Sequence, residues 1–263
     1  MSSRPPLAPL LRVRGLALSF GGVEVLRDLD FVLGAGSLTG LIGPNGAGKT
    51  ALFDVLSGLV RPRSGSVRLG NEELVGLAPH RITELGLART FQKLRVFPEL
   101  SLLDNVLAGM QARFRCSLSD ALLRRRGLRD RDAAAQAEAW RLLDLLGLRA
   151  LAAVAAGELS FGAQRRLEIA RALASDPALL LLDEPVAGMD PREAGDLLAC
   201  IRSLRSAGHA VLLIEHDMGF VMELCEQVLV LNGGSLIAQG DPEEVRASSL
   251  VMEAYRGYGA PAP

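Results

Sequence analysis

The sequence predicts an α/β fold in which a doubly wound, mostly parallel sheet is interrupted by a helical lobe. Of the 263 residues 49% are hydrophobic and only 4% aromatic, so an aliphatic core is expected. Such a core suits parallel strands covered by helices on both faces. In the second half of the chain short apolar runs alternate with segments of helical periodicity, whereas the middle of the chain has the helical pattern alone.

The order of the elements can be predicted along the chain. Residues 11–20 and 25–33 are expected to form a hairpin of strands joined by the turn Gly21-Gly22. The strand 37–42 precedes a helix at 49–58, a strand pair is expected around 65–69 and 87–90, and the segment 101–148 is expected to be helical. The remaining predicted elements are helices at 162–175, 191–207 and 218–225, strands at 178–182, 210–215, 227–231 and 235–239, and a final helix opened by Asp241-Pro242.

Charge and hydropathy exclude several classes of protein. The formal net charge of -1 argues against binding nucleic acid through bulk basicity. The longest apolar runs, such as 178–182, are much shorter than the ~20 residues of a membrane-spanning helix. Residues 1–10 lack the apolar core of a signal peptide and are expected to be a disordered tail. The three cysteines show no metal-ligand spacing, which indicates reduced thiols and a cytoplasmic location.

A glycine-rich run lies between a predicted strand and a predicted helix. The pattern G-x-x-x-x-G-K-T in this setting predicts a loop that binds the phosphates of a nucleotide. Gly46 and Gly48 allow backbone N–H groups to surround anionic oxygens. Lys49 is expected to neutralise the β- and γ-phosphates, and the hydroxyl of Thr50 to bind Mg²⁺. The complete run is Gly43-Pro44-Asn45-Gly46-Ala47-Gly48-Lys49-Thr50.

Two carboxylates follow an apolar strand. Asp183 and Glu184 come directly after four leucines, which places them at the carboxyl edge of the predicted sheet, where α/β folds bind ligands. Asp183 is expected to hold Mg²⁺, and Glu184 to polarise the attacking water. The alternative is an ordinary strand-to-loop transition. His216 leaves the same edge after the next strand, where it can sense a γ-phosphate, although a lone histidine is more often structural.

The segment Leu159-Ser160-Phe161-Gly162-Ala163-Gln164 precedes a helix. Ser160 and Gly162 stand where a capping hydroxyl and free N–H groups would meet an anion, but a simple N-capped helix is the alternative. The segment resembles the signature motif of ABC ATPases, Leu-Ser-Gly-Gly-Gln, and departs from it at Phe161 and Ala163. The resemblance implies that the signature of one subunit contacts the γ-phosphate held by the other, so that ATP joins a dimer.

The resemblance extends from about Leu11 to Tyr255. It implies a P-loop NTPase (RecA-like) core with an antiparallel β subdomain and an inserted helical subdomain. On this basis residues 1–10 are expected to be a disordered tail and residues 11–95 and 164–240 the ATP-binding core. Residues 96–163 are expected to be the helical signature subdomain, and residues 241–263 a C-terminal helix and tail.

The resemblance also implies roles for further residues. Phe20 matches the aromatic residue that stacks on adenine, although a core aromatic in a strand is nearly as good an interpretation. Gln92 matches the glutamine that contacts Mg²⁺ or the water and links the core to the helical lobe; a polar loop residue is the alternative. Asp190 matches a residue that communicates with the opposite subunit, and as an Asp before proline it is equally a helix N-cap.

Several stretches are similar to the ATPase subunits of branched-chain amino acid importers. Urea or amide importers and lipopolysaccharide exporters share part of the pattern, and stay as alternatives. A non-transport ABC ATPase is disfavoured, because the chain has neither a long coiled-coil insertion nor a second ATPase core. The stretches are Gly86-Leu87-Ala88-Arg89-Thr90-Phe91-Gln92, Arg165-Arg166-Leu167-Glu168-Ile169-Ala170-Arg171, Glu184-Pro185-Val186-Ala187-Gly188, Ile214-Glu215-His216-Asp217-Met218 and Ala254-Tyr255.

This likeness implies the partners. A second ABC ATPase subunit, identical or different, is expected to complete the dimer, and transmembrane permease subunits to dock on it. Leu94, Val96, Phe97 and Pro98 are the expected docking segment, unless they pack into the helical lobe. A periplasmic solute-binding protein would act indirectly, and no nucleic acid is expected. The expected location is cytoplasmic and peripheral, on the inner face of the cell membrane.

Overall fold

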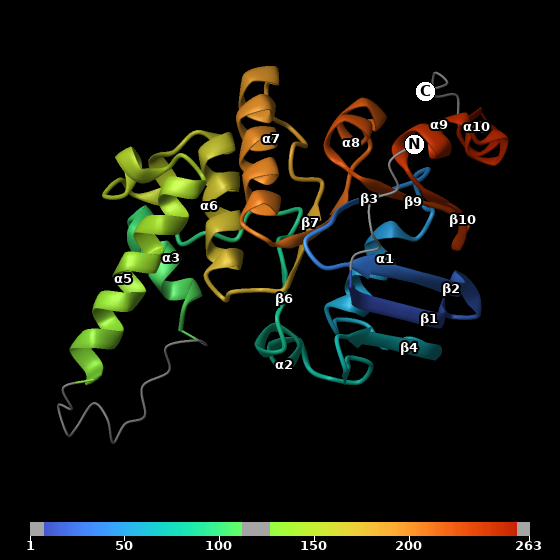
Figure 1. Ribbon diagram of the computed structural model, residues 1–263, viewed down its shortest axis with the longest axis horizontal. Helices are drawn as coiled ribbons and strands as arrows, with labels where there is room; N and C mark the ends of the chain where they lie inside the picture. Colours follow the sequence, from blue (N-terminus) through green and yellow to red (C-terminus); the bar gives the residue numbers. More distant parts are fainter. Residues whose placement is uncertain (1–7, 112–126, 257–263) are drawn as a thin grey trace. The chain divides into compact units, whose positions relative to one another are not determined.

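The computed structural model describes residues 8–111 and 127–256 (Figure 1). Backbone contacts divide them into two compact units. The first unit comprises the described residues up to Arg89, the segment Ala178–Pro185 and the described residues from Arg205 onward. The second unit comprises the described part of Thr90–Pro177 together with Val186–Leu204. Each unit is built around its own arrangement of secondary structure.

The N-terminal part of the first unit is an antiparallel sheet of order β2-β1-β4-β5. The expected hairpin is present, and Gly21 and Gly22 turn it with positive φ. β1 begins within the predicted tail 1–10, because the carbonyl of Leu10 accepts a hydrogen bond from the N–H of Gly70 and Pro9 pairs with β2. The strands are β1 (Pro9–Phe20), β2 (Val23–Gly34), β4 (Ser64–Leu69) and β5 (Glu72–Glu73).

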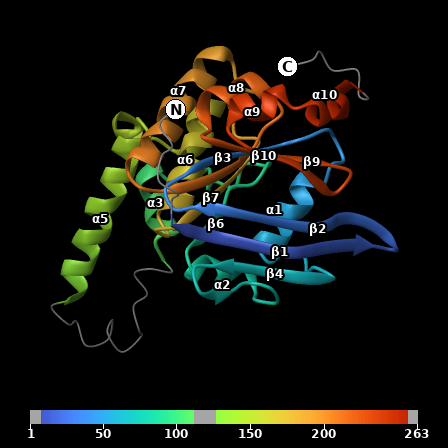
Figure 2. The ribbon, with the colours of Figure 1, turned by 45° about the vertical axis from the view of Figure 1, so that its right-hand side comes forward.

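The second sheet of this unit has the order β10-β9-β3-β8-β7-β6. Figure 2 labels its strands β3, β6, β7, β9 and β10. Its strands are parallel except β10, which runs antiparallel to β9. Every residue of β3, β7 and β8 is buried, which explains their unbroken apolar sequences. The strands are β3 (Leu38–Ile42), β6 (Leu87–Arg89), β7 (Leu179–Asp183), β8 (Ala210–Ile214), β9 (Gln227–Asn232) and β10 (Ser235–Gly240).

One expectation about strand pairing is wrong. The strands predicted around 65–69 and 87–90 exist, but they do not pair with each other. β4 pairs with β1 and β5, while β6 pairs with β7 in the other sheet. The alternating burial of β4 suits a sheet with one solvated face, whereas Leu87 and Ala88 of β6 are both buried. A helix that the sequence reading missed, α2 (Pro79–Glu84), separates them along the chain.

Helices cover both faces of the parallel sheet in the first unit. α1 (Lys49–Leu56) packs with residues of both sheets in one apolar cluster that includes Phe53 and Leu181. On the other face α8 (Met218–Leu224) approaches β3 so closely that a Cβ on Gly40 would lie 2.4 Å from Val221 Cγ1. The predicted final helix is two helices, α9 (Pro242–Ala247) and α10 (Ser249–Arg256), because Ser248 between them is extended.

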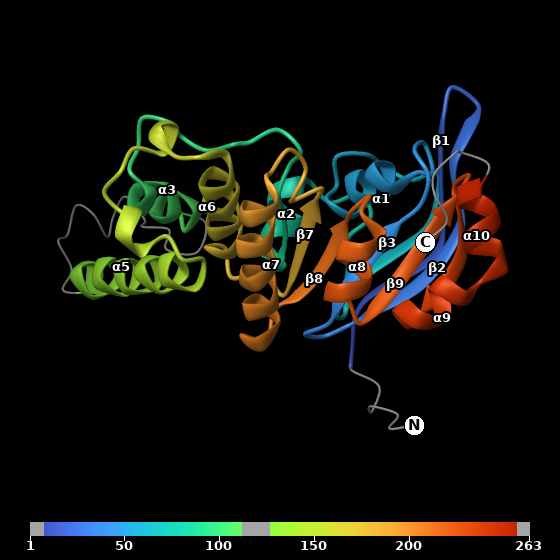
Figure 3. The same cartoon turned by 90° about the horizontal axis from the view of Figure 1, so that it is seen from above.

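The second unit is helical. α3 (Leu102–Gly109), α5 (Gly127–Leu145) and α6 (Phe161–Leu173) pack side by side (Figure 3). Short 3-10 turns at Arg149–Leu151 and Ala156–Glu158 lie between α5 and α6. Most of α7 (Pro191–Ser206) belongs to this unit. The unit is therefore larger than the predicted subdomain 96–163, because α6 packs on α3 and α5. Among the described residues, no helix is long and apolar enough to cross a membrane.

Candidate active site

The glycine-rich run forms the loop between β3 and α1, as its sequence predicts. Gly43 has φ 148°, and a Cβ there would lie 2.0 Å from the carbonyl oxygen of Leu231. Gly48 has φ 101° and is the N-cap of α1; a Cβ there would lie 2.8 Å from Leu26 Cδ2. Only glycine fits at these two positions. The glycines of the loop and the neighbouring residues Leu231 and Leu26 therefore both determine the conformation of the loop.

Neighbouring backbone braces the loop. The carbonyl of Ala47 accepts from the N–H of Gly234, in the turn between β9 and β10, at 3.1 Å. The carbonyl of Gly234 in turn accepts from the N–H of Arg27 on β2 at 2.8 Å. Asn45 and Gly46 are exposed at the rim. The loop is thus fixed on its inner side and open on its outer side, as a binding loop for an anion requires.

Lys49 is the first residue of α1, and its ammonium group is buried against the loop. Nζ donates to the carbonyl oxygens of Gly43 at 2.6 Å and of Pro44 at 3.0 Å. Burial lowers the pKa of Lys49, and the carboxylates of Glu184 and Asp183 oppose this effect. The cation is therefore held across the loop beside two acidic groups. Thr50 follows it and is exposed.

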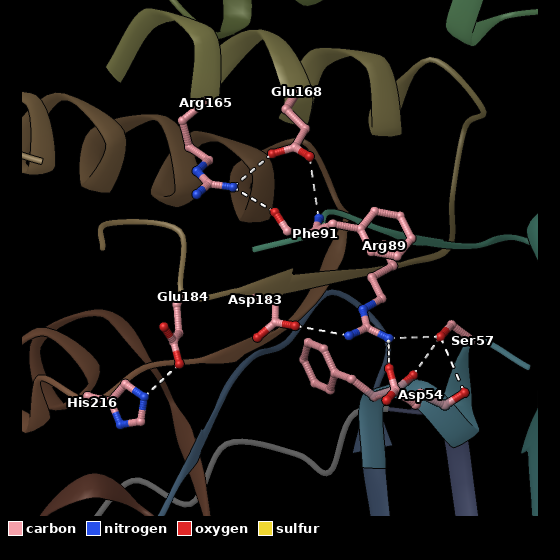
Figure 4. Close-up of polar contacts among 10 residues, drawn as sticks. Asp54, Ser57, Arg89, Phe91, Arg165, Glu168, Asp183, Glu184 and His216 are labelled. Atoms are coloured by element: carbon pink, nitrogen blue, oxygen red, sulfur yellow. Dashed lines mark hydrogen bonds and ion pairs between the residues drawn. The ribbon is translucent and has the colours of Figure 1, made fainter. Parts of the chain in front are cut away.

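Asp183 ends β7 and is buried in an ion pair with Arg89 of β6 (Figure 4). Arg89 Nη2 donates to Asp183 Oδ2 at 3.0 Å, while Nη1 donates to Asp54 Oδ1 at 2.6 Å and to Ser57 Oγ at 3.1 Å. Asp54 and Ser57 belong to the helix α1 and its C-terminal end. Burial raises the pKa of Asp183, and the hydrogen bond from Arg89 opposes this rise.

Glu184 and His216 meet at the ends of β7 and β8. His216 Nε2 and Glu184 Oε1 are 2.6 Å apart, a hydrogen bond that Figure 4 shows. The N–H of Glu184 donates to the carbonyl of Ile214, and its φ is 46°. A non-glycine residue in this region is strained and is held there by its surroundings. The predicted catalytic pair, Glu184 and His216, is therefore in contact, and it belongs to the first unit, as Lys49 and Asp183 do.

The signature segment lies at the start of α6 in the second unit. Ser160 is the N-cap, and its hydroxyl accepts from the N–H of Ala163 at 3.3 Å. The N–H of Gly162 donates to Glu193 Oε1 at 3.1 Å, and a Cβ on Gly162 would lie 2.8 Å from this carboxyl group. Asp190 caps α7, because its Oδ1 accepts from the N–H groups of Arg192 and Glu193. The carboxylate of Glu193 thus lies at the N-terminus of α6, where the sequence predicts that an anion binds.

Gln92 is exposed, in the segment that follows β6, and its backbone is anchored within the second unit. Arg165 of α6 donates to the carbonyl of Phe91 at 2.7 Å and to that of Gln92 at 3.0 Å. The same guanidinium forms a buried ion pair with Glu168 at 2.9 Å (Figure 4). Burial raises the pKa of Glu168, while Arg165 lowers it. The helix after the signature therefore fixes the residues around Gln92.

Two aromatic residues singled out in the sequence are exposed. Phe20, at the end of β1, is 52% exposed, so it is not the core aromatic of the alternative interpretation. Phe97, in the expected docking segment, is 46% exposed and lies under the guanidinium of Arg171. Leu94 and Val96 beside it are partly buried.

The residues present fit a magnesium ion that is bound together with a nucleotide. A buried carboxylate, Asp183, and a hydroxyl, that of Thr50, are oxygen ligands of the kind that Mg²⁺ prefers. In the described parts of the chain, no group of three or more His, Cys, Asp or Glu side chains could hold a metal ion by itself. Such a site requires further oxygens from the phosphates, which is the usual way in which Mg²⁺ binds at nucleotides.

Sequence reasoning missed several residues of the site. Arg89 could have been noticed as a charge ending an otherwise apolar strand, but its partners Asp54 and Asp183 are 35 and 94 positions away. Glu193 carries no local signal beyond its place in the first turn of a helix. Tyr255, on α10, forms a hydrogen bond with the backbone of Gly43 in the glycine-rich loop. All three depend on contacts between distant segments.

Comparison with known proteins shows the family of the chain. Residues 26–187 match the ABC transporter family. The chain is 40% identical, over 95% of its length and 98% of the relative, to the high-affinity branched-chain amino acid transport ATP-binding protein BraF of Pseudomonas aeruginosa. It is 35% identical, over 95% and 98%, to the lipopolysaccharide export system ATP-binding protein LptB of Acidithiobacillus ferridurans. The ADP conformation of MJ1267, an ATP-binding cassette of an ABC transporter, superposes with a TM-score of 0.81 at 29% identity, covering 95% of this chain and 99% of that one.

The chain belongs to the ABC transporter family. It is an ATP-binding and ATP-hydrolysing subunit that energises transport. Membership of the family implies, in general terms, that such subunits dimerise and work with membrane permease partners.

Tyr255 gives a prediction about stability at high pH. Burial raises the pKa of Tyr255 to about 12, so the folded state favours the neutral phenol. Because the phenol of an unfolded chain ionises near pH 10, this contribution is complete below about pH 10 and is lost as the pH rises to about 12. The urea midpoint of the wild type is expected to fall more between pH 9 and pH 11 than that of Tyr255→Phe. Equal falls of the two midpoints would contradict a raised pKa of Tyr255. Tyr258 is present in both proteins, so its ionisation does not affect the comparison.

Proposed function

We propose that this chain is the ATPase subunit of a branched-chain amino acid importer. The observation that carries the proposal is the identity of 40% over 95% of the chain to BraF, whose name gives that cargo. The lipopolysaccharide-export relative is less similar, at 35%. Urea or amide import stays as the second candidate, because the stretch Val186-Ala187-Gly188 suits both groups of importer.

The glycine-rich loop is the proposed binding site for the triphosphate of ATP. Its backbone N–H groups and the N-terminus of α1 meet the phosphate oxygens along Gly43, Pro44, Asn45, Gly46, Ala47 and Gly48. Lys49, whose Nζ binds the carbonyls of Gly43 and Pro44 in this structure, turns to the β- and γ-phosphates. Phe20 is exposed and offers its ring to the adenine. The cation and the exposed ring thus bind the two ends of the nucleotide.

Thr50, Asp183 and Gln92 are the proposed residues that hold Mg²⁺. The ion supplies neutralisation of the charge on the β- and γ-phosphates when it is bound. The carboxylate of Asp183 is already buried, so little further water is removed from it when the metal ion binds. Thr50 offers its hydroxyl from the first turn of α1. Gln92 belongs to the segment whose carbonyls Arg165 fixes.

Glu184 is the proposed general base. Its carboxylate accepts a proton from the attacking water, since the neighbouring Asp183 is committed to the metal. His216 holds the Glu184 carboxylate by the 2.6 Å hydrogen bond and is the proposed sensor of the γ-phosphate. The left-handed backbone at Glu184 is a further reason to place it in the chemistry, because strained residues cluster at active sites.

The signature residues are proposed to act across a dimer. Ser160 and Gly162 of one subunit bind the γ-phosphate held by the other, and Asp190 communicates with the opposite subunit. The exposed Phe97 belongs to the proposed docking segment for the permease, by which the protein lies on the cytoplasmic face of the membrane. A periplasmic solute-binding protein delivers the cargo to the permease. The second ATPase subunit is either an identical or a related chain.

Lys49→Ala tests the phosphate-binding loop. A charged hydrogen bond contributes about 1.5–3 kcal/mol, so its loss is expected to weaken ATP binding roughly 10- to 100-fold. Isothermal titration calorimetry with ATP measures the change. Arg27→Ala, an exposed residue of β2, is the matched control and is expected to bind ATP as the wild type does. Unchanged affinity of Lys49→Ala would refute the role of the lysine.

Glu184→Gln separates binding from chemistry. The amide cannot take a proton from water, so the turnover number is expected to fall roughly 10²- to 10⁴-fold while ATP still binds. A dimer is expected to accumulate in the presence of ATP, measured by size-exclusion chromatography with light scattering. Hydrolysis at the wild-type rate would show that Glu184 is not the base.

Transport assays test the cargo. Cells that lack this gene are expected to lose most uptake of radiolabelled leucine, isoleucine and valine at low external concentration, and the wild-type gene is expected to restore it. The same gene with Glu184→Gln is the matched control and is expected to restore none. Unchanged leucine uptake together with a loss of urea uptake would favour the second candidate.

A further inference from the structure

Arg89 connects three elements around the predicted metal site. Its guanidinium is almost completely buried, with 6% of the side chain exposed, and Figure 4 shows it between Asp183 on one side and Asp54 and Ser57 on the other. Nη2 binds Asp183 Oδ2 at 3.0 Å, and Nη1 binds Asp54 Oδ1 at 2.6 Å. The guanidinium carbon lies 5.5 Å from the centre of the Phe53 ring. Phe53, Asp54 and Ser57, from α1 and its C-terminal end, therefore hold the guanidinium in place together with Asp183.

This arrangement relates Asp183 to the phosphate-binding loop. Asp54 and Ser57 lie on the same helix, or at its C-terminal end, as Lys49 and Thr50. Arg89 therefore ties the end of β7 to the helix that begins with the phosphate-binding residues. The guanidinium donates this hydrogen bond to Oδ2 of Asp183 and not to Oδ1. A carboxyl group held by one oxygen cannot rotate freely about its terminal torsion.

We propose that Arg89 is a positioning residue for the reaction: it fixes the carboxylate of Asp183 so that Oδ1 stays available to the Mg²⁺ that binds with ATP. The inference rests on the proposed role of Asp183 in holding the metal. Arginine suits this task because its planar fork can donate in two directions at once, to Asp183 and to Asp54. A lysine offers a single point of charge and cannot fix both carboxylates in one geometry.

A purely structural role makes a different prediction. If Arg89 served only to join β6 to α1, its loss would lower stability and weaken nucleotide binding equally with and without metal. If the charge alone mattered, removing a cation beside Asp183 would strengthen the attraction of the site for Mg²⁺. Positioning predicts the opposite: the metal contributes less to binding when Asp183 is free to turn.

The test compares the dissociation constant of a fluorescent, non-hydrolysable ATP analogue in excess EDTA and in excess Mg²⁺. The dissociation constant in EDTA divided by that in Mg²⁺ measures how much the metal strengthens the binding of the nucleotide. Arg89→Met is expected to lower this ratio about tenfold, since a charged hydrogen bond is worth about 1.5–3 kcal/mol, while binding in EDTA stays close to that of the wild type. In an Asp183→Asn background, Arg89→Met is expected to lower the ratio no further.

Asp54→Asn is the matched control. The amide oxygen still accepts from Arg89, so the guanidinium stays in place and the ratio is expected to remain within about twofold of the wild type. If Arg89→Met fails to fold, Arg89→Lys keeps the charge without the fork and is expected to lower the ratio as well. A ratio that is unchanged or raised in the Arg89 variants, or one that falls equally in the Asp183→Asn background, would overturn the proposal. A wild type that gains nothing from Mg²⁺ would instead refute the metal role of Asp183.

Discussion

The burial of charge at the carboxyl ends of the parallel strands constrains the rest of this structure. Lys49, Arg89 and Asp183 are all nearly inaccessible to water, and an unpaired charge in such a place costs several kcal/mol. Each charge therefore has partners: the loop carbonyls for Lys49, and two carboxylates for Arg89. These partners come from the loop between β3 and α1, from α1 itself and from β7, so the same contacts that offset the burial also fix the geometry of the site.

Glycine and apolar packing provide the frame in which these charges are held. The loop between β3 and α1 can pass beneath the carbonyl of Leu231 only because Gly43 has no side chain. The turn at Gly234 then closes on the loop from the adjacent hairpin. In the second unit, a buried Arg165–Glu168 pair has the same task for the backbone of Phe91 and Gln92. Each unit thus contains a buried arginine that contacts a segment with a residue of proposed function, Asp183 in the first unit and Gln92 in the second.

Local signals predicted most of the strands, most of the helices and the position of the glycine-rich loop between β3 and α1. The loop could be recognised because its residues are contiguous, and Asp183, Glu184 and His216 because each follows an apolar strand. The features that were missed or predicted wrongly depend on residues that are far apart along the chain. Whether residues 87–89 pair with β4 or with β7 is decided by packing between remote segments, and so is the role of Arg89. The roles assigned to the site residues remain predictions.

The backbone at Glu184 has an evolutionary consequence. Its φ of 46° favours glycine or asparagine over glutamate. A change to either residue would therefore relieve backbone strain in the folded state. Selection for thermal tolerance alone would therefore tend to replace this residue and, on the proposed mechanism, discard hydrolysis. Retention of glutamate here in a population of variants would report that catalysis, rather than folding, is under selection.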